Sequence, residues 1–160
     1  MELYLLRHGS AERGQAGLPD SDRALTEGGE HEIRRVTAAA KLGHMSPSVI
    51  LASPYRRAMQ TARIAADVLG YKDPVLTTNA LQPESDVREV WDEIRVHRAH
   101  ASLLLCGHEP LFSAAAAYLL GCREVLVDFP NAGLMRIDLE SFAMEPRGVL
   151  KWMLAYYLTA

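Results

Sequence analysis

The stretch Leu3-Tyr4-Leu5-Leu6-Arg7-His8-Gly9 decides the fold, because an apolar run ends there in polar groups at the very start of the chain. A second run, Leu103-Leu104-Leu105-Cys106-Gly107, leads in the same way into His108. Short, continuous apolar runs are typical of strands that are buried in a parallel sheet. In open α/β sheets the functional crevice lies beyond the carboxyl ends of the strands. We therefore expect His8 and His108 to share one site.

Outward from these two runs, strand-like and helix-like segments alternate along most of the chain. Predicted strands cover residues 2–6, 49–52, 74–77 and 102–106, and predicted helices cover residues 27–42, 54–69, 86–97 and 110–120. Residues 133–139 and 149–157 are predicted as two late strands that pair at an edge. This alternation predicts an α/β fold with a mostly parallel central sheet and helices on both faces, and the late pair can make the sheet mixed.

Two helix starts carry recognisable signals. Thr26 is a predicted N-cap for the first helix. Ser53 is a predicted N-cap for the second, with Pro54 at its first helical position. Between the first strand and the first helix, residues 9–24 are polar and contain Gly14, Gly17 and Pro19, so they are predicted to form a loop over the strand's end.

Size and composition are those of an ordinary globular protein. The 160 residues fit one domain, predicted over residues 1–160, and 49% of them are hydrophobic and 23% charged. A net charge of −3 argues against nucleic-acid binding, which favours a basic domain. Cys106 and Cys122 form no disulfide framework and no metal-ligand cluster, and this cysteine usage indicates a reducing compartment.

The sequence carries no membrane signal. The apolar start of the chain ends at Arg7 and has no basic segment before it, unlike a secretory signal peptide. The longest apolar stretch, Leu111 to Leu120, is much shorter than the roughly 20 residues that span a bilayer. We therefore predict a cytoplasmic protein with no membrane partner, and the sequence predicts no particular oligomeric state.

The residues at the predicted strand ends suit phosphoryl chemistry. A neutral imidazole such as that of His8 is a competent nucleophile near neutral pH, since its reference pKa is about 6.5. Arg7 lies beside it, and Arg56 or Arg57 enters the same crevice; guanidinium forks bind phosphate bidentately. His108 can donate to a phosphoryl oxygen, and Glu109 is predicted to begin a helix whose backbone N–H faces the site.

Each of these groups also has an ordinary structural explanation. His108 alone would more often be a hydrogen-bonded structural histidine, and Arg56 and Arg57 resemble solvated surface charges. The functional interpretation is favoured because three separate strand ends supply groups that are all compatible with phosphate.

Four motifs together resemble the histidine phosphatase superfamily, which also contains the cofactor-dependent phosphoglycerate mutases. They are Leu6-Arg7-His8-Gly9, Arg23-Ala24-Leu25-Thr26 followed by Gly29, Ser53-Pro54-Tyr55-Arg56-Arg57-Ala58-Met59-Gln60-Thr61, and Gly107-His108-Glu109-Pro110. The short chain and the order of the motifs are most similar to the SixA-type phosphohistidine phosphatases. The resemblance implies a phosphoglycerate mutase-like three-layer α/β/α sandwich.

The resemblance also implies roles for individual residues. His8 matches the nucleophile that forms a phosphohistidine intermediate, and Arg7, Arg57 and His108 match the other catalytic and substrate-binding residues of the pocket. In the family pattern Ser-Pro-x-x-Arg-Ala-x-x-Thr the ligand arginine is the fifth residue counted from the serine itself, hence Arg57 and not Arg56. Gly9 and Glu109 are further expected substrate-binding residues, and the resemblance implies no metal and no organic cofactor.

The chain departs from the larger family members at the proton donor. They carry a glutamate on an inserted segment as general acid, whereas here only Glu84 and Asp86 lie in the corresponding short span, and Glu84 is the possible general acid. A phosphorylated imidazole has a leaving group with a pKa near 6.5 and needs little protonation. The expected substrate is therefore phosphohistidine on a partner protein. A small phosphorylated substrate, or a catalytically silent phosphate-binding module, is the alternative.

Overall fold

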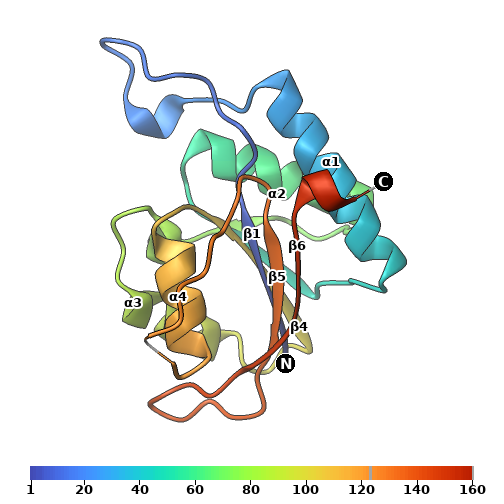
Figure 1. Cartoon of the computed structure of the whole chain (residues 1–160), viewed down its shortest axis with the longest axis vertical. Coiled ribbons are helices and arrows are strands. Elements are labelled where there is room, and N and C mark those ends of the chain that lie inside the picture. Colours follow the sequence, from blue (N-terminus) through green and yellow to red (C-terminus); the bar gives the residue numbers. More distant parts are fainter. Residues whose placement is uncertain (123, 160) are drawn as a thin grey trace.

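The computed structural model describes residues 1–122 and 124–159. Within these ranges six strands form one mixed sheet in the order β3-β2-β4-β1-β5-β6 (Figure 1). The strands are β1 (Glu2–Arg7), β2 (Val49–Ala52), β3 (Leu76–Thr77), β4 (Ser102–Gly107), β5 (Leu134–Asp138) and β6 (Val149–Leu154). Strands β3, β2, β4 and β1 are parallel, and β5 runs antiparallel to both β1 and β6. The sheet is mostly parallel, as the alternation of strands and helices predicts.

The strand register brings the chain segments after β1, β2 and β4 to one level. Arg7 lies opposite Gly107, and Ala52 lies opposite Cys106. The backbone N–H of His8 donates to Gly107 at 3.0 Å. Residues that follow these three strands therefore leave the sheet side by side at its carboxyl edge.

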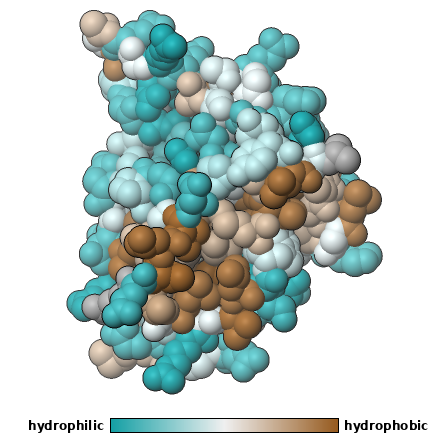
Figure 2. Space-filling view, in the orientation of Figure 1, coloured by the Kyte–Doolittle hydropathy of each residue, from teal (hydrophilic) through white to brown (hydrophobic). Residues whose placement is uncertain are grey.

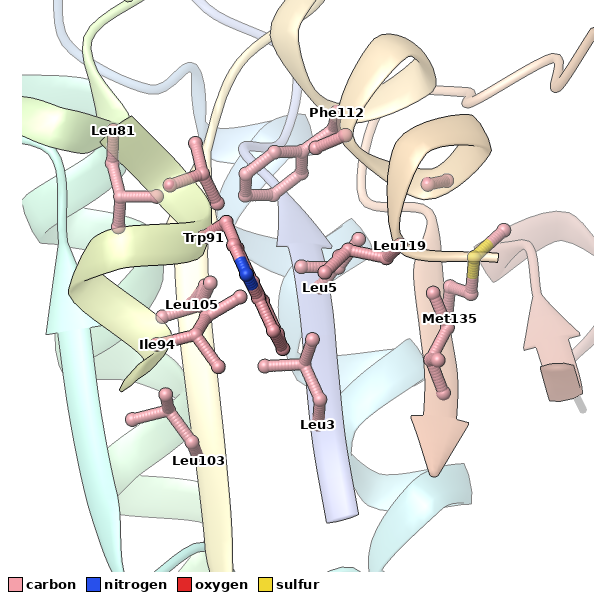
Figure 3. Packing of buried hydrophobic residues seen from close by; sticks show 14 of the residues in the cluster. Leu3, Leu5, Leu81, Trp91, Ile94, Leu103, Leu105, Phe112, Leu119 and Met135 are labelled. Atoms are coloured by element: carbon pink, nitrogen blue, oxygen red, sulfur yellow. The ribbon is translucent and has the colours of Figure 1, made fainter. Parts of the chain in front are cut away.

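Helices cover both faces of the sheet, which confirms the three-layer α/β/α fold (Figure 1). Helices α1 (Glu27–Leu42) and α2 (Arg56–Leu69) pack on one face, where Tyr4, Leu6 and Leu104 point. Helices α3 (Val87–Val96) and α4 (Leu111–Leu119) cover the other face, and Figure 3 shows Trp91 and Phe112 of these helices against the β1 and β4 leucines. Successive strand residues thus point to opposite faces, and both are apolar because both are covered.

The prediction that Ser53 and Pro54 open helix α2 is wrong. The helix begins at Arg56, and its N-cap is Tyr55, whose carbonyl accepts from the backbone N–H of Ala58 and Met59. The backbone N–H of Ser53 still donates to Cys106 of β4 at 3.0 Å, so this residue continues the sheet. The helix cannot begin until the chain has left that pairing. Thr26 does cap α1 as predicted, and its hydroxyl accepts from Gly29 at 3.0 Å.

Several predicted boundaries also move. Helix α4 begins at Leu111, so Glu109 precedes it and the prediction that Glu109 begins a helix is wrong. The last strand ends at Leu154, before the predicted residue 157, and a 3-10 turn (Tyr156–Leu158) follows. Arg35 of α1 donates to the carbonyl of Thr159, which holds this last turn against α1 and away from the strand direction.

The loop between β1 and α1 stands at one end of the molecule, beyond the carboxyl end of β1 (Figure 1). It contains a short 3-10 turn, Asp20–Asp22. Figure 2 shows that this end of the surface is hydrophilic, whereas apolar surface gathers elsewhere. In the described ranges, no helix combines the length and the apolar character needed to cross a bilayer.

Candidate active site

The imidazole of His8 is held in one tautomer at the carboxyl end of β1. Its Nδ1 lies 2.8 Å from the carbonyl oxygen of Gly9, and its Nε2 lies 3.2 Å from Nε of Arg57. A guanidinium N–H can only donate, so Nε2 accepts this hydrogen bond through its lone pair. The ring proton is therefore on Nδ1, where it donates to Gly9. His8 presents an unprotonated Nε2, which is the form that can act as a nucleophile.

The surroundings of His8 favour this neutral form. Burial, together with the charges of Arg57, Arg7 and Arg23, lowers its pKa to about 4 against the opposing hydrogen bond to Gly9. A free imidazole with a pKa of about 6.5 is partly protonated near neutral pH. Inside this cationic and partly desolvated site, His8 is almost wholly neutral near pH 7.

The structure brings Arg57, and not Arg56, to His8. The side chain of Arg57 is 4% exposed, whereas Arg56 is exposed on the helix surface. Besides its contact with His8, Arg57 donates to the backbone carbonyl of Asp20 at 2.7 Å and to its carboxylate at 2.9 Å. Each of the three guanidinium nitrogens therefore makes one hydrogen bond, and the second N–H group on each terminal nitrogen can still donate to an incoming anion.

Arg7 reaches the same end of the sheet from the last position of β1. One of its terminal nitrogens donates to the carbonyl of Phe129 at 2.5 Å. Its Nε is buried and has no hydrogen-bond partner among residues 1–122 and 124–159. Burial lowers its pKa, against the nearby charges of Glu109 and Asp128. A buried donor without an acceptor is a suitable ligand for an anion.

His108 follows β4 and is 1% exposed. Its ring centroid lies 5.1 Å from that of His8, edge to face. Nε2 lies 2.9 Å from the hydroxyl of Ser53, while the buried Nδ1 has no partner within the described residues. Burial, together with the neighbouring His8 and Arg57, holds the pKa of His108 far below its ordinary value. His108 is therefore neutral, and one ring nitrogen is left for a ligand.

Gly9 lies where the loop after β1 packs closely against the backbone of α1. A Cβ on Gly9 would overlap the carbonyl of Gly29, so only glycine permits this close approach of the loop to α1. The carboxylate of Glu109 accepts from the backbone N–H of Ser113 at 2.9 Å and from its hydroxyl, so it caps α4. Substrate binding by Gly9 and Glu109 remains a prediction that concerns their backbone groups.

Glu84 approaches the pocket through Tyr55. The Tyr55 hydroxyl donates to the exposed Glu84 carboxylate at 3.2 Å. The Tyr55 ring lies 5.1 Å from the ring of His108 and 5.0 Å from the guanidinium carbon of Arg57. Tyr55 is therefore a wall of the site, and Glu84 lies on its outer side.

Sequence reasoning misses the site contacts of Asp20, Ser53 and Tyr55. Asp20 bridges Arg57 and Arg23, with a distance of 2.6 Å to a terminal nitrogen of Arg23. Burial raises the pKa of Asp20, but the hydrogen bonds from Arg57 and Arg23 outweigh it, so this pKa lies below its ordinary value. Ser53 and Tyr55 stand in the quoted motif beside Arg57, which is a usable signal, whereas nothing in the polar loop singles out Asp20.

The arrangement is suited to a tetrahedral oxyanion. Two arginines and two neutral histidines converge from the ends of β1, β2 and β4. Nε of Arg7, a donor, and Nδ1 of His108, a donor or an acceptor, are buried and have no hydrogen-bond partner in the described chain. Among the residues that the structure describes, no group of three or more His, Cys, Asp or Glu side chains could hold a metal ion. Such a site can bind a phosphoryl group and place its phosphorus next to Nε2 of His8.

Comparison with known proteins agrees with this geometry. The family model of the histidine phosphatase superfamily (branch 1) matches residues 3–84. The phosphohistidine phosphatase SixA of Escherichia coli (strain K12) is 31% identical over 121 residues, which cover 74% of each chain. An uncharacterized protein of Picosynechococcus sp. (strain ATCC 27264 / PCC 7002 / PR-6) is 36% identical over 137 residues, covering 84% of this chain and 83% of that protein.

Solved structures share the whole fold. The structure of the protein histidine phosphatase SixA complexed with tungstate superposes with a TM-score of 0.87 at 26% identity, covering 98% of both chains. Family model, relatives and fold agree over a range that contains both the Arg-His-Gly motif and the arginine of α2. The chain therefore belongs to the histidine phosphatase superfamily.

Proposed function

We propose that this protein is a phosphatase that works through a covalent phosphohistidine on His8, and that its substrate is phosphohistidine on a partner protein. The tautomer of His8 carries the proposal: Nδ1 donates to the Gly9 carbonyl, and the unprotonated Nε2 faces the Arg57 guanidinium. A nucleophile held next to a cation, with its lone pair directed to that cation, is ready for an anionic electrophile.

In the first step, Nε2 of His8 attacks the phosphorus and the bond from phosphorus to the leaving group breaks. The leaving group departs with the bonding electron pair and takes up a proton. In the second step, water attacks the phosphorus of phosphohistidine, the bond between phosphorus and Nε2 breaks, and the electron pair returns to the imidazole. The oxygen and both protons of the water leave with the phosphate. Arg7, Arg57 and His108 contact the phosphoryl oxygens in both steps, because catalysis of phosphoryl transfer is largely positioning and charge stabilisation.

The position of Glu84, the possible general acid, supports a substrate with a phosphorus–nitrogen bond. Glu84 is exposed and lies behind Tyr55, so any proton it supplies reaches the leaving group through a long or mobile path. An alkoxide needs that proton, whereas an imidazole leaving group with a pKa of about 6.5 needs it far less. The similarity to the phosphohistidine phosphatase SixA points to the same substrate class.

The test compares leaving groups on one enzyme. We would measure kcat/KM on a protein that carries phosphohistidine and on alkyl phosphates from a panel of phosphorylated metabolites, with His8→Asn as the inactive control. Preference for phosphohistidine by at least about a hundredfold is expected, since several kcal/mol of leaving-group stabilisation separate the substrates. Preference for one metabolite would instead identify a small-molecule phosphomonoesterase. Phosphate binding without turnover of any substrate would identify a silent binding module.

A further inference from the structure

Ser53 contacts the candidate site although it belongs neither to a helix nor to the set of phosphate-compatible groups. It is fully buried at the carboxyl end of β2, and its backbone is fixed by the hydrogen bond to Cys106 of β4. Its hydroxyl lies 2.9 Å from Nε2 of His108 and 3.4 Å from the backbone nitrogen of Tyr55. The side chain therefore meets one obligate donor and one imidazole nitrogen that can either donate or accept.

The hydrogen bonds around the Ser53 hydroxyl distinguish between the two neutral tautomers of His108. The Ser53 oxygen accepts from the Tyr55 N–H, which supplies no acceptor for the hydroxyl proton. Because Ser53 is buried, that proton needs an acceptor, and within the described chain the partner in reach is Nε2 of His108. If Nε2 carried the ring proton instead, the buried Ser53 hydroxyl would donate to nothing, and Nδ1 would bury a bare lone pair where an anion binds. With the ring proton on Nδ1, the Ser53 hydroxyl donates to Nε2, and the Nδ1–H can donate to a bound anion.

We infer that Ser53 is a positioning residue: its hydroxyl donates to Nε2 of His108 and so places the ring proton on Nδ1, which donates to an oxygen of the phosphoryl group. The inference rests on the phosphoryl transfer proposed for His8. The hydrogen bond made by one imidazole nitrogen sets the protonation of the other. Because burial keeps His108 neutral, its tautomer decides whether Nδ1 attracts or repels the anion.

This assignment also explains why the chain leaves β2 through Ser53 before the helix starts. A serine that capped α2 would turn its hydroxyl toward the helix N–H groups. Here the cap position is Tyr55, two residues later, and the Ser53 hydroxyl remains directed to His108. One hydroxyl thus joins the ends of β2 and β4 across the site.

The first test needs no turnover. In protein labelled with ¹⁵N-histidine, the nitrogen chemical shifts of His108 report which ring nitrogen carries the proton. Wild-type protein is expected to show the Nδ1–H tautomer, and Ser53→Ala a mixture of both tautomers. The Nε2–H tautomer in wild-type protein would overturn the inference, whether or not the variant folds.

The second test measures the effect of Ser53 through His108. Ser53→Ala is expected to weaken orthovanadate binding and to lower kcat by about tenfold each, the range of one lost hydrogen bond to an anion. In a His108→Ala background the same substitution should change neither quantity by more than about twofold, because the residue through which it acts is gone. Equal losses in both backgrounds would show a purely structural role.

Ser102→Ala is the matched control. Ser102 is another buried serine, at the opposite end of β4, and its hydroxyl donates to the Ser46 carbonyl at 2.8 Å. Its removal should cost stability but leave orthovanadate affinity unchanged. If wild-type protein turned over no phosphorylated substrate, the proposed function would fail, whereas the chemical shifts and orthovanadate binding would still decide the role of Ser53.

Discussion

Nε of Arg57 lies 3.2 Å from Nε2 of His8, so the nitrogen that we propose as the nucleophile is held by a cation in the free protein. A protonated His8 could not accept this hydrogen bond, and two positive groups at this distance would repel each other. The contact therefore selects the neutral nucleophile. When a phosphoryl group enters, the Arg57 N–H can turn to one of its oxygens, so the hydrogen bond is exchanged and not lost.

The low pKa of His8 predicts a stability loss in acid. Its pKa is about 4 in the folded protein, from burial and then from the nearby arginines, against about 6.5 in the unfolded chain. Between these values the unfolded chain binds a proton that the folded chain does not, so the contribution is complete above pH 6.5 and is lost as the pH falls toward 4. The loss amounts to at most about 3 kcal/mol.

Urea unfolding of wild type and His8→Gln at pH 7 and pH 4.5 measures this effect. Glutamine does not titrate, so the variant should lose less stability between the two pH values than wild type. Equal losses in both proteins would mean that His8 has an ordinary pKa in the folded state.

The two neighbouring arginines of α2 should behave differently. Arg57 is buried against His8, whereas Arg56 is exposed. Arg57→Ala should lower kcat/KM on the order of 10²–10³-fold, the usual effect of removing a preorganised donor to a transition-state oxygen. Arg57→Lys should restore little, because an ammonium lacks the guanidinium fork. Arg56→Ala should stay within about twofold of wild type, and the reverse order would contradict the site geometry.

We expect Asp20 to compete with a bound anion for the guanidinium of Arg57. Its carboxylate accepts from Arg57 and pairs with Arg23, yet its side chain is 55% exposed, so this pairing is only weakly stabilising. Asp20→Asn removes the negative charge and keeps a similar shape. Orthovanadate should then bind about three- to tenfold more tightly, which titration calorimetry can measure. Weaker binding would show that Asp20 is needed to hold Arg57 in position.

The paired glycines at the start of α1 provide a matched test of the loop after β1. A Cβ on Gly29 would overlap the backbone of Ser10, whereas the nearest atom to a Cβ on Gly28 is the Thr26 hydroxyl at 3.7 Å. Gly29→Ala should destabilise the fold by at least about 1–3 kcal/mol because the backbone must shift. Gly28→Ala should be neutral or stabilising by up to about 1 kcal/mol, since alanine favours the helix. Similar thermal midpoints for the two variants would contradict this close approach.

The strand ends could be predicted because β1 and β4 are buried on both faces and therefore appear as uninterrupted apolar runs. His8 and His108 follow those runs directly, and the parallel register brings them together. Arg57 could be selected over Arg56 from the family pattern, and its burial agrees with that choice. Most residues of the candidate site could therefore be identified from the motifs and their order along the chain.

Other features depend on tertiary contacts that leave no local pattern. Ser53 followed by proline has the composition of a helix start, but its pairing with β4 keeps it in the sheet and frees its hydroxyl for His108. Asp20 lies in a loop of mixed polar residues, and only the fold of that loop over α2 brings it to Arg57. The last turn leaves the strand direction because Arg35 of α1 binds the Thr159 carbonyl.

The proposed mechanism requires that phosphorus becomes bonded to Nε2 of His8 during turnover. Phosphoramidate, a small phosphoryl donor with a phosphorus–nitrogen bond, can be mixed with the protein and the reaction quenched in alkali, followed by peptide mass spectrometry. We expect one acid-labile phosphoryl group on His8 and none in His8→Asn. A phosphoryl group on another residue, or release of phosphate with His8 never modified, would contradict the account.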